Sequence, residues 1–393
     1  MSDAPSTRLL RAVRPLTAPG TDPEVVAALL AWSVRPRRTL EGVRRTLATR
    51  GALARPPAEQ LLAEVAAHLD DDDREAARRL LPRWRARSCR LSVVGDPAYP
   101  ARLGEDWPTT DGPVLLAVAG TPPSAGPTVA IVGSRNATSY GSGIAAWLAE
   151  AASAAGVHVV SGGALGVDAA AHGAALHGPG GTSVVLGCGH DVAYPRPHAR
   201  PGGLFDQVLA AGGGLLSEQP PCVPPTPGVV RARNRIVAGL ADAVVVVEGG
   251  RRSGSLLTAT AALERGRPVL AVPGDIRRPG SAAPNRLLSE GAGTCTDPAD
   301  LLAALPGTDD RRALAPSAPP QASGEPMTTL PGTVHRLLVA GWPRAIVRDE
   351  LIARSGRAPG EVLAALTRAQ LAGEVVERAD GFVLRRRPAR SPR

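Results

Sequence analysis

Apolar residues follow two different spacings along this chain, and the change from one to the other divides it into parts. Up to about residue 90, Leu, Val and Ala recur every three or four positions, which places them on one face of a helix. We expect four helices there, at residues 24–32, 40–49, 58–68 and 74–87. The pattern therefore predicts an all-helical N-terminal domain over residues 1–92.

Short apolar runs replace this spacing from residue 114 onward. The strands expected from them lie at 114–118, 128–132, 157–160, 183–186, 215–217, 243–247 and 269–272. Helices are expected between the later strands, at 142–155, 168–176, 204–211, 229–240 and 255–265. Apolar strands that alternate with helices indicate a parallel sheet covered on both faces. We therefore predict an α/β domain with a doubly wound sheet over residues 93–305.

The C-terminal part begins after a stretch rich in Pro, Ala, Ser and Gly, residues 306–328, which predicts a linker. Three helices are expected next, at 333–340, 346–354 and 359–372, and then two strands, 375–377 and 382–385, around an Asp-Gly turn. Three helices followed by a hairpin are typical of a winged-helix-like domain, here residues 329–387. A terminal hairpin without any role in DNA binding fits the same pattern. Residues 388–393 form a basic tail.

The amino-acid composition indicates what kind of partner the protein binds and in which cellular compartment it lies. The formal net charge is +9, which favours an acidic partner such as nucleic acid. The four cysteines are scattered without CxxC spacing, which favours a reducing cytoplasm. Cys188, His190 and His198 lie close in sequence but lack a fourth ligand, so no metal site is expected. No apolar run approaches the roughly 18 residues of a membrane span, so no membrane contact is expected.

Five short motifs carry the candidate chemistry, and four of them contain arginine. Most follow an expected strand or open an expected helix, where free backbone N–H groups hold phosphate. Glycine allows the backbone to approach a ligand, and a guanidinium can grip phosphate through two hydrogen bonds. Together the motifs predict a surface that binds a polyanion. The predicted binding residues are Ser134, Arg135, Asn136, Gly162, Gly163, Arg196, Arg233, Asn234, Arg235, Arg252, Ser253, Gly254 and Ser255.

Finer expectations concern three of these segments. The glycines of Ser161-Gly162-Gly163, with a helix opening at Asp168, predict an anion-accepting nest in which Asp168 caps the helix. Residues two apart do not share a helix face, so at most one of Arg233 and Arg235 should face a ligand. Glu248 is the one carboxylate considered for catalysis, and without an evident partner we expect it to be structural. The chain has neither a Walker nor a G-x-G-x-x-G motif, so no catalytic residue and no cofactor are expected.

In sequence and order, these motifs resemble those of the DNA-processing protein A (DprA/Smf) family. The matching segments are VGSRNAT, SGGALGVDAAAH, DVAYPRPH, RARNRIVAGL, RSGSLLTA and RPVLAVPGD, between Tyr99 and Gly293. The resemblance implies an extended Rossmann-like domain that dimerises and binds single-stranded DNA. It also implies protection of that DNA and loading of a RecA-type recombinase, as in natural transformation, without catalysis. By position, Arg135 and Arg196 correspond to the family's basic DNA contacts.

Two other functions stay open on the residues alone. A Rossmann-like phosphoribohydrolase would cleave nucleotide N-glycosidic bonds, but the turn from Glu248 to Ser255 lacks the glutamate that such enzymes carry downstream. A winged-helix regulator would use the C-terminal domain, where residues 331–393 hold 12 Arg and 6 Asp or Glu. The helix expected to enter the major groove carries only Arg368, which favours docking to a partner instead.

Overall fold

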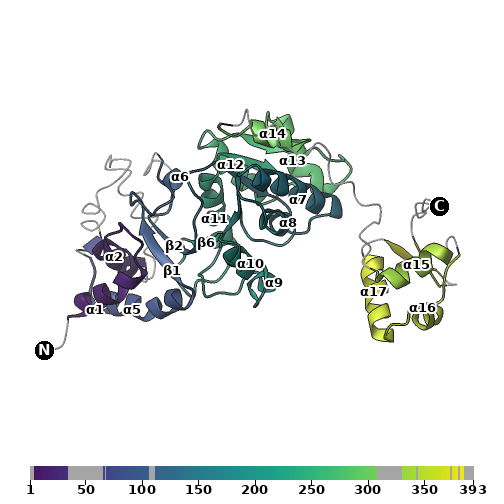
Figure 1. Cartoon of the computed structure of the whole chain (residues 1–393), viewed down its shortest axis with the longest axis horizontal. Helices are drawn as coiled ribbons and strands as arrows, with labels where there is room; N and C mark the ends of the chain where they lie inside the picture. Colours follow the sequence, from purple (N-terminus) through teal and green to yellow (C-terminus); the bar gives the residue numbers. More distant parts are fainter. Residues whose placement is uncertain are drawn as a thin grey trace. The chain divides into compact units, whose positions relative to one another are not determined.

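The computed structural model describes residues 4–33, 65–66, 68–105, 111–307, 330–341, 344–371, 374–378 and 381–384 (Figure 1). The chain divides into two compact units, Met1–Pro319 and Pro320–Arg393. The expected helix 40–49, most of 58–68, nearly all of the linker and the basic tail lie outside the described residues.

The first unit is built on a sheet of nine strands within the described part of the chain. In sequence order these are β1 (Cys89–Val93), β2 (Leu115–Gly120), β3 (Thr128–Val132), β4 (His158–Ser161), β5 (Thr182–Val185), β6 (Gly214–Ser217), β7 (Ala243–Val246), β8 (Val269–Ala271) and β9 (Gly293–Thr294). Their order across the sheet is β1-β2-β6-β5-β4-β3-β7-β8-β9. All neighbours from β6 to β9 are parallel, whereas β1 and β2 are antiparallel additions at one edge. The prediction of a parallel-dominated α/β sheet is confirmed.

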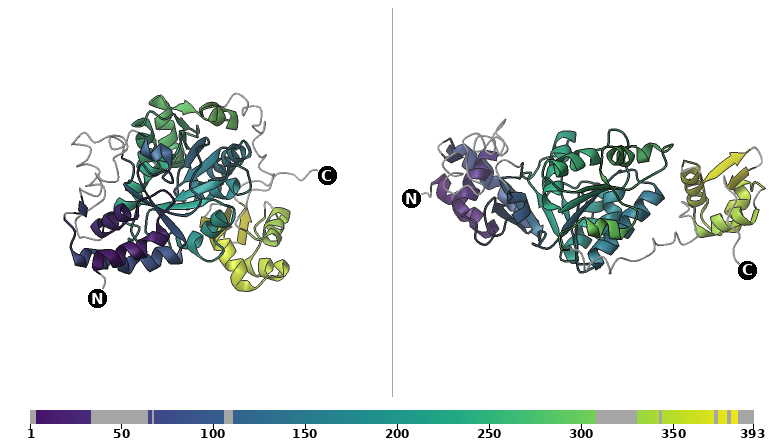
Figure 2. Two further views of the ribbon diagram at one scale, coloured as in Figure 1. Left: turned by 60° about the vertical axis from the view of Figure 1, so that its left-hand side comes forward. Right: turned by 90° about the horizontal axis from the view of Figure 1, so that it is seen from above.

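Helices cover both faces of this sheet, as Figure 2 also shows. Their bounds are α7 (Ser139–Ala154), α8 (Val167–Ala175), α9 (Arg196–Ala199), α10 (Leu204–Ala210), α11 (Pro227–Leu240), α12 (Ser255–Leu263), α13 (Ala282–Ser289) and α14 (Pro298–Ala303). Side chains alternate across a strand. Val129 and Ile131 of β3 accordingly join the apolar core that contains α7, α8 and α14 residues, and Ala130 and Val132 join the core with α11 and α12 residues. Two-sided burial explains why these strands are apolar along their whole length.

The N-terminal part differs from the expectation at one helix, residues 5–13, and at one strand, neither of which was predicted. The helices are α1 (Pro5–Val13), α2 (Pro23–Ser33) and α5 (Asp71–Ala86), with short helical turns at Arg14–Leu16 and at α6 (Ala101–Gly104). Residues 89–93 form β1, which pairs with β2 and was not predicted. Arg90 and Ser92 interrupt its apolar residues, so the run lacks the continuity of the central strands. Leu91 and Val93 are nevertheless buried with the helices and tie them to the sheet edge.

The second unit is described by itself. It contains α15 (Gly332–Gly341), α16 (Arg348–Ser355) and α17 (Pro359–Leu371), followed by the antiparallel pair β10 (Val375–Arg378) and β11 (Gly381–Leu384). Ile346 adds an antiparallel bridge to Phe382. Val334, Leu351 and Leu366 are buried with Phe382 in a small core of its own. The three helices and the hairpin were predicted from the sequence.

No helix in the described part of the chain is long and apolar enough to cross a membrane.

Candidate nucleic-acid interface

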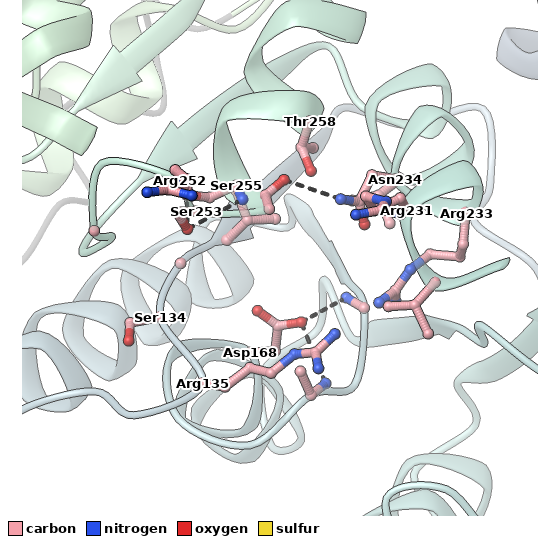
Figure 3. Close-up of a pocket in the computed structure, with 18 of the residues that line it drawn as sticks. Ser134, Arg135, Asp168, Arg231, Arg233, Asn234, Arg252, Ser253, Ser255 and Thr258 are labelled. Atoms are coloured by element: carbon pink, nitrogen blue, oxygen red, sulfur yellow. Dashed lines mark hydrogen bonds between the residues drawn. The ribbon is translucent and has the colours of Figure 1, made fainter. Parts of the chain in front are cut away.

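A cleft of about 550 Å³ lies at the carboxyl ends of β3, β4 and β7 (Figure 3). Strands β4, β5 and β6 extend the sheet from one side of β3, and β7, β8 and β9 extend it from the other. The cleft therefore lies at the point where the strand order reverses, which is where open parallel α/β sheets bind their ligands. Its walls are the loops after β3 and β4, the loop before α12, the middle of α11 and the amino-terminal half of α12.

Most of the residues predicted from the sequence motifs meet in this cleft. Those that line it are Ser134, Arg135, Asn136, Gly162, Arg233, Asn234, Arg252, Ser253, Gly254 and Ser255. Gly163, Arg196 and Arg235 do not line it. The structure adds others, among them Arg231, Val230, Val237 and Thr258. Val230, Asn234 and Val237 are spaced so that they lie on one face of a helix. This spacing could have identified, from the sequence, the face of α11 that lines the cleft and the neighbouring Arg231.

The cleft is strongly basic. Four arginines line it, whereas Asp168 is the only carboxylate among its described lining residues. Arg135, Arg231 and Arg252 are exposed to solvent. The Nη1 group of Arg135 donates to the Tyr194 hydroxyl at 3.3 Å, which connects the loop after β3 to the segment leading into α9. Three exposed guanidinium groups around one opening form a site for a polyanion.

Arg233 differs from these three because it is buried, with only 7% of its surface exposed. Its Nη1 donates to the Val185 carbonyl oxygen, and its Nε has no hydrogen-bond partner among the described residues. Burial lowers the pKa of Arg233, and the nearby Asp168 carboxylate acts in the opposite direction. Arg233 thus supplies positive charge from beneath the cleft and positions the surrounding loops.

The carboxylate of Asp168 occupies the nest that the sequence predicted for a ligand anion. Its Oδ2 accepts hydrogen bonds from the backbone N–H groups of Gly162 at 3.1 Å and Ala164 at 3.2 Å. The expectation that Asp168 caps α8 is wrong, because Gly166 holds the N-cap position and no side chain caps it. Burial raises the pKa of Asp168, and the Arg233 charge and the backbone hydrogen bonds lower it. The loop after β4 is therefore stabilised by the chain's own carboxylate.

Glu248 has a structural partner outside the cleft. Its carboxylate accepts from the backbone N–H of Thr138 at 2.9 Å and from the Thr138 hydroxyl at 2.5 Å. Thr138 is the N-cap of α7, so Glu248 holds the start of that helix against the end of β7. A Cβ at Gly141 would lie 2.3 Å from this carboxylate, so only glycine fits there. Glu248 is buried and does not line the cleft.

Arg235 and Arg196 lie outside the cleft for different reasons. Arg235 does not line the cleft, and its guanidinium pairs instead with Glu218 at 2.6 Å and Asp111 at 3.7 Å. The expectation that Arg233 and Arg235 do not face one ligand together agrees with this geometry. Arg196 begins α9 and is exposed. In the same short helix, His198 contacts the Gly163 carbonyl oxygen through Nδ1 at 2.9 Å, which holds α9 against the loop after β4.

The Cys188, His190 and His198 side chains contact separate backbone carbonyl groups. Cys188 donates to Val192 at 3.8 Å, and the His190 Nε2 contacts the Ala117 oxygen at 3.0 Å. In the part of the chain that the structure describes, no group of three His, Cys, Asp or Glu side chains is placed to hold a metal ion.

The fold and the cleft define a parallel α/β protein with a basic binding site at its topological switch point. The family model of DNA recombination-mediator protein A matches residues 90–306. The chain is 37% identical over 291 residues to the protein Smf of Escherichia coli strain K12, a match that covers 74% of this chain and 75% of that protein. It is 36% identical over 230 residues to the DNA processing protein DprA of Bacillus subtilis strain 168, covering 58% and 75%.

A solved structure agrees with these sequence matches. The X-ray structure of DNA processing protein A from Streptococcus pneumoniae aligns over 77% of this chain and 98% of that chain, with a TM-score of 0.52 and 29% identity. The chain therefore belongs to the DNA recombination-mediator protein A family. The resemblance drawn from the sequence motifs is confirmed.

Proposed function

We propose that this chain binds single-stranded DNA in the cleft, protects it, and loads a RecA-type recombinase onto it, as in natural transformation. The observation that carries the proposal is the set of exposed guanidinium groups of Arg135, Arg231 and Arg252 around one opening at the switch point. Each can hold a phosphate through two hydrogen bonds. Membership of a family described as DNA recombination mediators supports the same function.

The form of the cleft supports a single strand as the ligand. A volume of about 550 Å³ is that of a pocket for a small organic molecule, so one nucleotide is a suitable occupant. The lining combines arginines with the apolar side chains of Val230 and Val237, which can pack against an unpaired base. A base within a duplex is stacked and paired and cannot enter such a pocket without leaving the helix.

We propose further that the protein is not an enzyme. The carboxylates of Asp168 and Glu248 accept hydrogen bonds from the backbone and hold the loop after β4 and the start of α7, which supports structural roles for both. The hydroxyl groups that line the cleft have no histidine beside them among the described lining residues. The alternative, a nucleotide N-glycosidase, would release free base from nucleoside monophosphates. Detection of free base by chromatography would contradict the proposal that the protein is not an enzyme and would support the N-glycosidase.

The second unit is proposed to be a winged-helix-like module that docks a partner. The exposed face of α17 carries Glu361, Leu363, Thr367 and Arg368, with one positive and one negative charge. A helix that enters the major groove generally presents several basic or polar contacts to the bases and phosphates. We also propose that the chain acts as a homodimer, which light scattering of the purified protein would test.

The proposed activity is tested in two stages on the full chain. Fluorescence anisotropy with a labelled thymidine oligonucleotide should show binding that weakens steeply as salt rises, and a duplex of the same length should bind less tightly. The protein should then accelerate the assembly of a RecA-type recombinase on single strands coated with single-strand-binding protein. Binding without acceleration would exclude the loading role, and the absence of binding would exclude the DNA-binding role.

A further inference from the structure

The cleft has two chemically different zones. Its rim carries the three exposed arginines described above, which suit phosphate groups. Its inner zone contains the apolar side chains of Val230 and Val237, the Asn234 amide, the Thr258 hydroxyl and the Asp168 carboxylate. Figure 3 shows Thr258 and Asn234 on the facing helices α12 and α11, with Asp168 opposite them. Such a mixture of apolar walls and a few polar groups is typical of pockets that hold an organic ring.

Asp168 makes the inner zone unsuitable for phosphate. Its Oδ2 accepts the Gly162 and Ala164 N–H groups, so these donors are already used and cannot bind a ligand anion. The other carboxylate oxygen is directed away from them in Figure 3. The side chain is 6% exposed and lines the cleft. The nearby Arg233 charge is already balanced by this carboxylate, so a phosphate placed there would gain little attraction and would face the carboxylate in a partly desolvated site, where repulsion is stronger than in water.

We propose that the inner zone holds one unpaired nucleobase and that Asp168 selects a base whose exocyclic amino group can donate to its carboxylate. The inference rests on the proposed function, because it assigns a specificity to the same cleft. Phosphates on either side of that nucleotide lie at the arginine rim. The base packs against Val230 and Val237 on α11, with its polar edge towards Asp168.

A comparison of strands that contain cytosine with strands that contain thymine separates this proposal from simple phosphate binding. Both are pyrimidines of nearly equal size, but position 4 carries an amino donor in cytosine and a carbonyl acceptor in thymine. An ionised carboxylate accepts hydrogen bonds and cannot donate them. Asp168 therefore favours cytosine and repels the thymine O4. Only one base of the strand occupies the inner zone, so we expect a preference of about ten- to a hundredfold, the value of one hydrogen bond to a charged group.

The first test uses the wild-type chain and three labelled oligonucleotides of equal length. One contains only deoxycytidine and one only thymidine. In the third, each cytosine is replaced by 2-pyrimidinone, which is cytosine without its 4-amino group. The deoxycytidine strand should bind most tightly, and the 2-pyrimidinone strand should lose about ten- to a hundredfold relative to it. This comparison does not depend on whether any variant folds.

The second test uses Asp168→Asn. The side-chain oxygen of the asparagine can still accept hydrogen bonds from the two backbone N–H groups. Its NH2 group then takes the place of the other carboxylate oxygen and presents a hydrogen-bond donor to the cleft. The preference for cytosine should disappear or reverse, because the new donor suits the thymine O4. Asp72→Asn is the matched control, since Asp72 is exposed on α5 and loses the same charge. It should keep the preference of the wild type.

The possible results separate the inference from the proposed function. Failure of every oligonucleotide to bind the wild type would contradict the proposed function itself. Equal binding of all three strands by the wild type would leave DNA binding in place and overturn the role of Asp168. If Asp168→Asn tightened the binding of all three strands equally, the inner zone would hold phosphate, and the inference would again be wrong.

Discussion

The guanidinium group of Arg233 lies directly against the backbone of Gly162, so that a Cβ at position 162 would fall 2.0 Å from Nη1 and 2.4 Å from Cζ. These residues belong to two motifs 71 positions apart, on α11 and on the loop after β4. The arginine fits beneath the loop because the loop has no side chain at this point. Asp168 then holds the same loop through the N–H of Gly162. The two motifs thus form one folded unit.

Gly162→Ala should displace Arg233 and lower the free energy of unfolding by about 1–3 kcal/mol, the usual cost of overpacking a tight site. DNA binding should weaken as well, because the loop and the guanidinium both move. Chemical denaturation and oligonucleotide titration measure the two effects. Gly173→Ala is the control, since a Cβ there, within α8, meets nothing within 4 Å. Equal stability of the two variants would contradict the close fit of Arg233.

Arg231 and Arg235 should behave in opposite ways although they lie one turn apart on α11. Arg231→Ala should leave stability unchanged and reduce the salt dependence of single-strand binding by about 0.7 in the logarithmic slope, the value of one phosphate contact. Arg235→Ala should lower the free energy of unfolding by about 1–3 kcal/mol, because Glu218 is left partly buried without this ion pair. The salt slope should stay as in the wild type. A lower slope in Arg235→Ala would place that residue on the DNA.

The buried side chain of His172 should lower the free energy of unfolding in mild acid. Burial lowers the pKa of His172 to about 3, from an ordinary value near 6.5. The unfolded chain therefore takes up a proton below about pH 6.5 that the folded chain refuses, and stability falls as the pH falls. Between pH 7 and pH 5 this group should account for about 2 kcal/mol.

His172→Gln isolates that contribution. The variant is expected to be less stable at pH 7, because the His172 Nδ1 contact with the Thr182 hydroxyl at 2.7 Å is lost. Its decrease in unfolding free energy between pH 7 and pH 5 should nevertheless be smaller than that of the wild type. Urea denaturation at both pH values gives the comparison. An identical decrease in both proteins would show that His172 is already protonated in the folded state.

The central sheet and most of the cleft could be predicted from the sequence because each rests on a local signal. Val129 to Val132 are apolar on consecutive positions because both faces of β3 are covered, and the glycine and arginine that follow mark the end of a parallel strand. The prediction missed β1 because it relied on continuous apolar runs, whereas in β1 Cys89, Leu91 and Val93 alternate with Arg90 and Ser92. Its pairing with β2 places this alternating segment at the edge of the sheet.

The roles of single polar residues depended on contacts between segments far apart in sequence. Nothing local distinguishes Arg231, which faces the cleft, from Arg235, whose partners Glu218 and Asp111 come from other parts of the chain. The motif around Gly162 indicates a loop that can hold an anion. That the anion is the chain's own Asp168 follows from the path of the loop in three dimensions, which spacing alone does not specify.

The most direct test of DNA binding in this cleft is a titration of a labelled single strand over a series of salt concentrations with two double variants. Arg135→Ala/Arg252→Ala removes two rim charges, and Arg78→Ala/Arg79→Ala removes the same charge from the exposed face of α5, away from the lining residues. The first should lose affinity and about 1.4 units of logarithmic salt slope, corresponding to two phosphate contacts, while the second keeps the slope of the wild type. Equal losses in both, or an unchanged slope in the first, would contradict the assignment of this cleft as the DNA-binding site.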